Sequence, residues 1–102
     1  MTVRAKFKVV SITRTMGSRV KKDAAGNPVK NARGYEEHEP CEMWTIRMQP
    51  VYGNGDPNHE NTKFWQASPG GSLELNCVNA EAVKQFELDR EMYLDFTLAP
   101  AA

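Results

Sequence analysis

Alternation of apolar and basic side chains near the start of the chain is the feature that most limits its fold. The order over this segment is Val3, Arg4, Ala5, Lys6, Phe7, Lys8 and Val9. Successive side chains of a strand point to opposite faces, so this order predicts a half-buried β-strand over residues 3–13. The alternation breaks at Val9–Val10 and resumes at Ile12 in the opposite phase. A β-bulge or sharp bend has this effect in strands that curl into small barrels.

A second strand is predicted over residues 43–52, where Trp44, Ile46 and Met48 share one apolar face. Pro50 has no N–H to donate to a neighbouring strand. We therefore expect this end of the strand at an edge or a bend of the sheet.

Two adjacent aromatic residues, Phe64 and Trp65, precede the turn sequence SPGGS at residues 68–72. A three-residue hairpin loop there would pair Trp65 with Leu75. This register separates apolar from polar side chains better than a two-residue loop does. We therefore expect Trp65 in the core and Phe64 on the polar face of the sheet.

The end of the chain predicts a helix and a last strand. Asn79 is expected to cap a short helix over residues 80–86, followed by a strand over residues 91–99. The inward side chains of that strand would be Met92, Leu94, Phe96 and Leu98. Its outward face carries Glu91 and Asp95, which complement the basic face of the first strand. The two terminal strands are therefore expected to pair.

Residues 14–42 lack a sustained period and are rich in Gly, Pro, Asn and charge. We expect a long charged excursion over residues 16–42, with a turn at residues 25–28. A loop of this length in a small domain is usually functional or disordered.

The predicted elements amount to one all-β domain over residues 1–102, β-rich with one short helix. It would be a small OB-like barrel or a compact β-sandwich. No apolar run approaches the length of a membrane span. Two cysteines, Cys41 and Cys77, do not make a disulfide framework, and this favours an intracellular setting.

Charge is unevenly distributed along a chain whose net charge is zero. Residues 1–33 hold nine basic groups and one acid, a net charge of +8, and residues 34–102 carry the balancing −8. The asymmetry could mark a basic arm for nucleic acid. It could equally mean that two halves of the fold neutralise each other, or that a basic loop meets a neighbouring copy. We favour neutralisation within the fold.

Candidate binding residues combine the basic side chains of the excursion with aromatic rings. They are Arg19, Lys21, Lys22, Lys30, Arg33, Tyr35 and Phe64. A basic loop beside stacking rings is how single-strand binders hold nucleic acid. An outward Phe64 is more often covered by its own chain or by a protein partner.

Catalytic and metal-binding signatures are weak in this sequence. No activated nucleophile, phosphate loop or dinucleotide fingerprint stands out, so we expect a protein that is not an enzyme and has no cofactor. Among His38, Cys41, His59 and Cys77, only the first two have a spacing typical of a zinc site. We expect no metal site.

Three stretches resemble a family of small, mostly uncharacterised tailed-bacteriophage proteins. They are VRAKFKVVSITRT, ENTKFWQASPGGSLELNCVN and AVKQFELDREMYLDFTLA. The resemblance implies a small compact domain of phage origin, located in the virion or the host cytoplasm, and it supplies no catalytic residues. The chain departs from the family in having Asp89–Arg90 where a glycine-containing turn is expected, and in its long insertion over residues 16–42.

The leading hypothesis is a non-enzymatic bacteriophage structural protein. It would be a capsid decoration or cement subunit that binds capsid or other virion proteins and could form a homo-oligomer. The alternative is an OB-type accessory protein that binds single-stranded nucleic acid. A third hypothesis is an inhibitor of a host defence protein.

Overall fold

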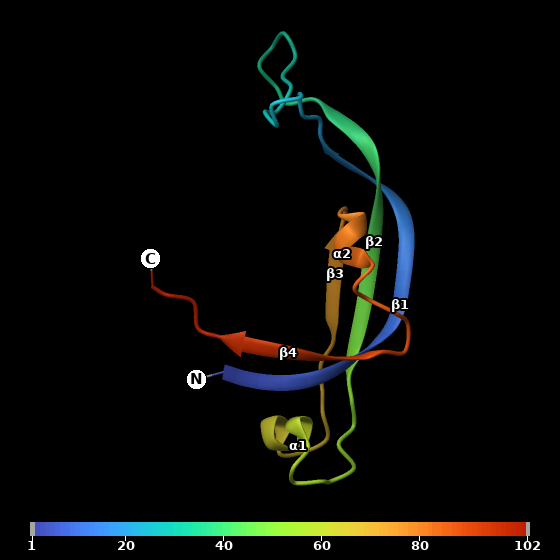
Figure 1. Ribbon diagram of the computed structural model, residues 1–102, viewed down its shortest axis with the longest axis vertical. Helices are drawn as coiled ribbons and strands as arrows, with labels where there is room; N and C mark the ends of the chain where they lie inside the picture. Colours follow the sequence, from blue (N-terminus) through green and yellow to red (C-terminus); the bar gives the residue numbers. More distant parts are fainter. Residues whose placement is uncertain (1, 102) are drawn as a thin grey trace.

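A computed structural model describes residues 2–101, which form four strands and two short helices (Figure 1). In chain order they are β1 (Thr2–Val20), β2 (His38–Pro50), α1 (Glu60–Trp65), β3 (Leu73–Cys77), α2 (Ala80–Val83) and β4 (Glu91–Thr97). The strands form one antiparallel sheet in the order β3-β2-β1-β4. The predicted all-β class is therefore confirmed, with two short helices in place of one.

β1 is central to the sheet because it pairs with two different partners. Residues 2–8 pair with β4, and residues 7–20 pair with β2. The register against β2 shifts between Val9 and Ser11, so Val10 is the extra residue of a β-bulge. After the shift Ile12 lies opposite Ile46. The predicted bulge is confirmed, and β1 bends strongly between its two halves (Figure 1).

The core lies on one face of the curled sheet. Its buried apolar residues are Ala5, Phe7, Val9, Ile46, Met48 and Val83. Partly buried side chains surround them: Ile12, Trp44, Trp65, Leu73, Cys77, Phe86, Met92 and Leu94. Most of these are the positions that alternation assigned to the inner face, so the burial pattern of β1 and β2 follows from the sequence.

The predicted pairing of the terminal strands is confirmed, since β4 lies beside residues 2–8 of β1. Of its four predicted inward side chains, Met92 and Leu94 pack against the core. The other two are exposed, Phe96 by 53% and Leu98 by 94%. This part of the prediction is wrong because β2 ends at Pro50, and beyond that point the sheet has only the strands β1 and β4, with Phe96 exposed on its inner face.

The predicted hairpin around residues 68–72 is wrong. Phe64 and Trp65 lie in helix α1, and β3 pairs with β2 so that Leu75 lies opposite Ile46. His59 caps α1 by accepting a hydrogen bond from the N–H of Asn61 on its Nδ1. The helix ends at Gln66, which adopts the left-handed conformation at φ 55°.

Trp65 still faces the core and Phe64 still lies outside, but helix geometry is the reason. The Trp65 ring lies 6.1 Å from Phe7, and its indole N–H donates to the carbonyl of Gly70. Phe64 is 46% exposed, and the centre of its ring lies 4.5 Å from that of Trp65. Consecutive residues of a helix diverge around its axis, so only one of the two rings reaches the core.

α2 begins as predicted at Asn79. The side-chain oxygen of Asn79 accepts hydrogen bonds from the N–H groups of Glu81 and Ala82. The helix is shorter than expected, and it buries Val83 against the sheet. A capped single turn held by one buried side chain is thus enough to carry the chain from β3 towards β4.

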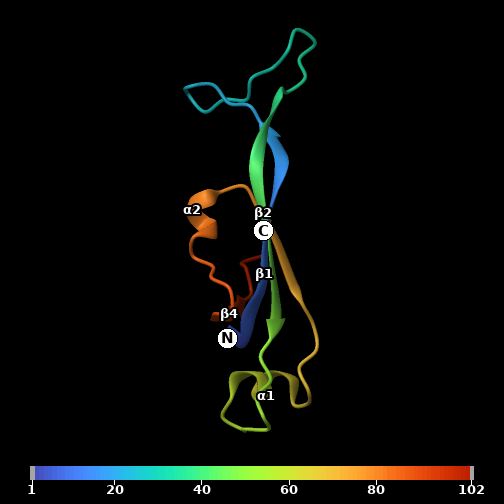
Figure 2. The ribbon, with the colours of Figure 1, turned by 90° about the vertical axis from the view of Figure 1, so that its right-hand side faces the viewer.

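The sheet of residues 2–101 is open, with β3 and β4 as its edges, so neither the barrel nor the two-sheet sandwich is observed. The molecule measures 61 × 35 × 20 Å (Figure 2), and its radius of gyration is 18.7 Å. A compact chain of this length would have a radius of about 13 Å. Its accessible surface is 7771 Å², against about 5,800 Å² for a compact monomer of this mass.

The predicted excursion over residues 16–42 is partly a continuation of the sheet. Residues 16–20 of β1 pair with residues 38–42 of β2. β3 reaches only as far as Trp44 on β2, so the sheet beyond it is a two-stranded ribbon. We call residues 14–43 the arm, and the turns over residues 21–37 its tip. The sequence shows no apolar period here because both faces of the ribbon are largely exposed.

Asn61 holds α1 against the open edge of β1. Its side chain is fully buried, accepts the N–H of Lys6 at 2.6 Å and donates to the carbonyls of Lys6 and Val51. These are the bonds that a continuing strand would make at this edge. The carboxamide therefore ends the ladder between β1 and β2 without leaving buried backbone groups unpaired.

We expect Asn61→Ala to lower the free energy of unfolding by about 1–3 kcal/mol, because it leaves buried backbone groups without partners. Urea unfolding followed by tryptophan fluorescence would measure the change. Asn58→Ala is the matched control, since Asn58 is exposed three positions earlier. Equal stability of the two variants would contradict the role assigned to Asn61.

Candidate functional site

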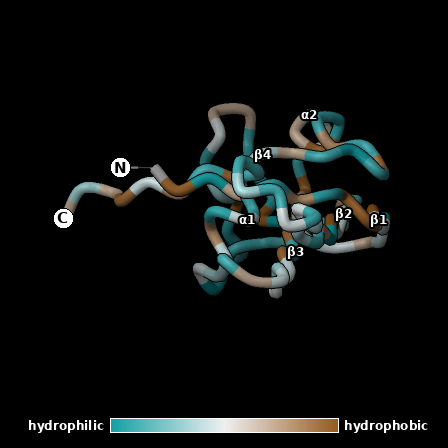
Figure 3. Tube along the Cα trace, turned by 90° about the horizontal axis from the view of Figure 1, so that it is seen from below, coloured by the Kyte–Doolittle hydropathy of each residue, from teal (hydrophilic) through white to brown (hydrophobic). Residues whose placement is uncertain are grey.

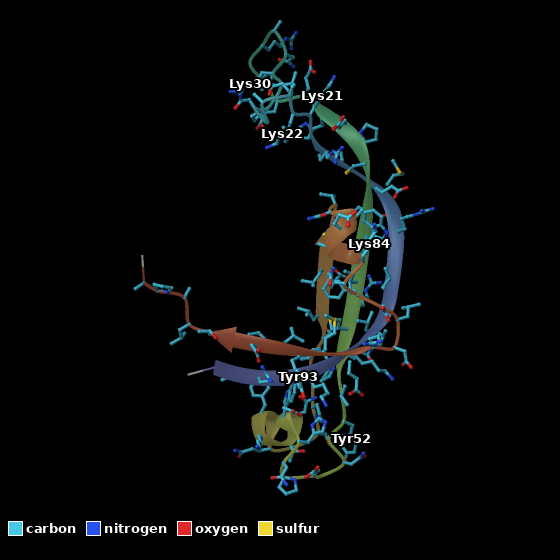
Figure 4. All side chains as sticks on the ribbon, in the orientation of Figure 1. Lys21, Lys22, Lys30, Tyr52, Lys84 and Tyr93 are labelled. Carbon is cyan, nitrogen blue, oxygen red and sulfur yellow. The ribbon has the colours of Figure 1, made fainter. Side chains whose placement is uncertain are left out.

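Six of the seven predicted binding residues lie together at the far end of the arm. Arg19 is on β1, and the tip carries Lys21, Lys22, Lys30, Arg33 and Tyr35. Figure 4 shows the three lysines at this end of the molecule. Phe64, the seventh, lies on α1 at the opposite end (Figure 1) and belongs to no common site with them.

Two side-chain-capped turns shape the tip. The Asp23 carboxylate accepts the N–H groups of Ala25 and Asn27, and Gly26 takes the left-handed conformation at φ 85°. A turn forms here as predicted, but it lies over residues 23–26, two residues earlier than expected, with the N–H of Gly26 donating to the carbonyl of Asp23. Asn31 caps a second turn in the same way, accepting the N–H groups of Arg33 and Tyr35. Short polar side chains of this kind fix turns locally, so the tip is ordered by its own sequence.

Every basic side chain of β1 has an acidic partner. The pairs are Arg4–Asp95, Lys6–Glu60, Lys6–Glu91, Lys8–Asp89, Arg14–Glu42 and Arg19–Glu39. Both neighbours of β1 contribute acids, because the basic third of the chain lies between segments from the acidic remainder. This arrangement supports the interpretation that the sequence asymmetry is neutralised within the fold.

Four cations of the tip differ from those of β1. Among the residues that the structure describes, no ion pair involves Lys21, Lys22, Lys30 or Arg33. The tip also carries three acids, so its net charge is only +1. Tyr35 is 67% exposed beside them. The tip therefore offers an adaptable polar surface with one aromatic ring and no strong single-sign field.

A second charged cluster lies where α1 meets β1 and β4. The guanidinium of Arg4 lies 4.4 Å from the centre of the Tyr93 ring and donates two hydrogen bonds to Asp95. These bonds lower the pKa of Asp95 and raise that of Arg4. The pKa of Glu60 is lowered by its own backbone N–H, and further by a hydrogen bond from Tyr93. The cluster binds β4 and α1 to the same face of β1.

The described surface has several open hollows, and one beside β4 is lined by charged side chains that include Glu87, Arg90 and Glu91. One depression of about 290 Å³ beside α1 is lined by Tyr52, Gly53, Gly55, Thr62, Gln66, Ala67, Ser68 and Pro69. That lining has no carboxylate, imidazole or thiol, and so lacks an acid–base pair for catalysis.

The four metal-ligand candidates lie on different elements. His38 and Cys41 are on the arm, His59 caps α1 and Cys77 ends β3. Within residues 2–101 no group of three or more potential ligands is close enough to hold a metal ion. Both cysteines are free thiols. None of the helices described is long and apolar enough to cross a bilayer.

Sequence patterns missed two exposed features. Met16 is 69% exposed on the arm, and Phe96 is 53% exposed beside the open edge of β4. Phe96 follows the inward alternation of its strand and therefore looked like a core residue. Its exposure follows from the structure, because β2 ends at Pro50 and does not extend beside Phe96.

Comparisons with protein-family models, with curated proteins and with solved structures found no match. The resemblance to bacteriophage proteins therefore stays a prediction from the sequence.

The Arg4–Asp95 pair should make stability depend on pH in the acid range. Because the pKa of folded Asp95 is lowered from 3.8, its contribution is present at neutral pH and lost as the pH falls through the folded value. We expect Asp95→Asn to lower the free energy of unfolding at pH 7. At about pH 2 the free energy of unfolding of the variant should be close to that of the parent protein. Urea unfolding at several pH values would measure this. Glu36→Gln in the tip is the matched control. A difference in the free energy of unfolding between Asp95→Asn and the parent that stays the same at every pH would contradict the prediction.

Proposed function

We propose that the protein is a non-enzymatic structural protein of a bacteriophage virion, a decoration or cement subunit that binds neighbouring capsid proteins. The observation that carries the binding role is the accessible surface, about 2,000 Å² larger than that of a compact monomer. A standard interface buries about 800 Å² on each partner. The phage assignment rests on the sequence resemblance.

The arm is the part best suited to grip a neighbour. An isolated two-stranded ribbon is marginally stable in water, and a third strand or a packed element is usually needed. Between Arg14 and Val20, no third strand from the described part of the chain pairs with the arm. A groove on a neighbouring subunit would supply the missing layer and cover Met16. The unpaired cations of the tip would suit an acidic rim around that groove.

Shortening the arm tests this role. Val20 and His38 lie directly opposite each other, so a two-residue Asn-Gly turn can replace residues 21–37. We expect the shortened protein to unfold at nearly the same urea concentration, because the tip contributes nothing to the core. It should lose retention on purified capsids, measured by co-sedimentation.

The matched control is Lys63→Gln, which keeps the whole arm, removes one exposed cation on α1 and should leave retention on capsids unchanged. Co-purification of the parent protein with intact virions is the accompanying observation. A protein absent from virions, or a shortened variant that binds capsids as the parent does, would overturn the proposal.

Binding of single-stranded nucleic acid is the second candidate, favoured by the four unpaired cations beside exposed Tyr35. Four phosphate contacts would give a log–log salt slope of about −2.8. The decoration role predicts no binding of a labelled oligonucleotide at micromolar protein, measured by fluorescence anisotropy at two salt concentrations. Tight binding with that slope, weakened by Lys21→Gln and Lys22→Gln, would replace the leading proposal.

A further inference from the structure

The second two-stranded region of the sheet lies at the other end of β1. Residues 2–6 of β1 pair only with β4, because β2 has ended at Pro50. This ribbon projects from the body of the molecule (Figure 1), and apolar residues lie along it near the chain ends (Figure 3). Val3 and Phe96 lie opposite each other on its inner face, 40% and 53% exposed. The ribbon therefore lacks a third strand, and its inner face is exposed at Val3 and Phe96.

The two edges of this ribbon are not equivalent. On the β1 side, α1 blocks the edge, because Asn61 occupies the backbone groups of Lys6. On the β4 side, the edge strand Glu91–Thr97 contains no lysine and no proline. Those residues, bulges and covering elements are the usual devices that prevent edge-to-edge pairing. Among residues 2–101, no strand pairs with the outer edge of β4, and its register against β1 has no bulge.

Backbone directions show which groups of β4 face outward. The N–H of Val9 donates to the carbonyl of Arg90, so Val9 and alternate residues before it direct their backbone groups towards β4. Ala5 lies opposite Leu94 in this register. The backbone groups of Leu94 are then used by β1, and those of Tyr93 and Asp95 point to the open edge.

We propose that two copies of the chain pair through their β4 edges, antiparallel and around a twofold axis at Leu94, to form one continuous eight-stranded sheet. In this register Tyr93 and Asp95 of one copy exchange hydrogen bonds with Asp95 and Tyr93 of the other. Met92 lies opposite Phe96 of the second copy on the inner face. Both apolar faces then lie on the same side of the joint sheet and continue each other.

Charge selects this register over its neighbours. A twofold axis at Tyr93 would place Glu91 opposite Asp95 of the second copy, and an axis at Asp95 would place two aspartates opposite each other. Like charges directly opposite across strands are destabilising. Only the axis at Leu94 puts the Tyr93 ring opposite Asp95. The inference concerns the isolated protein and does not depend on the virion assignment.

Cysteine substitution tests both the dimer and its register, in a background carrying Cys41→Ala and Cys77→Ala. Leu94 would face its own copy as a non-hydrogen-bonded pair with Cα atoms about 4.5 Å apart, within disulfide range. We expect mild oxidation to cross-link Leu94→Cys into a dimer on non-reducing gels. Tyr93→Cys and Asp95→Cys are the matched controls and should stay largely monomeric. Preferential cross-linking of either control would overturn the register.

Sedimentation equilibrium of the unmodified chain tests the dimer without any substitution. We expect a monomer–dimer equilibrium that Phe96→Lys weakens about tenfold or more, because it places a charge opposite Met92 on the inner face. Leu98→Lys, beyond the strand, is the control and should leave the equilibrium unchanged. Circular dichroism of each variant shows whether it is folded. The proposal would be overturned if the folded parent chain stays monomeric at all concentrations. It would also be overturned if neither Phe96→Lys nor Leu98→Lys changes the dimer equilibrium.

Discussion

The pairing of one long strand with two partners is the constraint on which this structure depends. β1 holds β4 along its first residues and β2 along the rest, and the bulge at Val10 bends it between them. The bend brings Met92 and Leu94 of β4 towards the same core as Ile46 and Met48 of β2. Without the bend, the apolar side chains of β2 and β4 would not meet over one face of β1, and they would form two separate small cores.

The same constraint explains the electrostatics. A strand that lies between two others must face charged side chains from both, and the basic side chains of β1 meet acids from β2, β4 and α1. Exposed pairs of this kind contribute little to stability individually. Their main effect is on register and specificity, because a shifted strand would bring like charges together. Among the described residues, the cations that are in no ion pair are Lys63 on α1 and the four of the tip.

Two-stranded regions at both ends of β1 give the molecule its extended shape and its two proposed contacts. The arm would dock on a neighbouring capsid protein, and the β4 edge would join a second copy. The two surfaces lie on different parts of the sheet (Figure 1), so one protein could use both at once. A dimer with two arms would bind a repetitive surface at two points, which raises avidity when the spacing matches.

Local patterns in the sequence determined the strands around the core, the bulge at Val10, the cap at Asn79 and the pairing of basic with acidic terminal strands. Each follows from neighbours within a few residues or from simple charge complementarity. Tertiary structure decided the rest. The six residues of α1 are too few to form a stable helix alone, and the buried contact of Asn61 with Lys6, 55 positions away, fixes them. The arm is held by hydrogen bonds between its two strands, and both of its faces are exposed. Its sequence therefore shows no alternation of apolar and polar residues. Exposure of Phe96 depends on where a different strand ends.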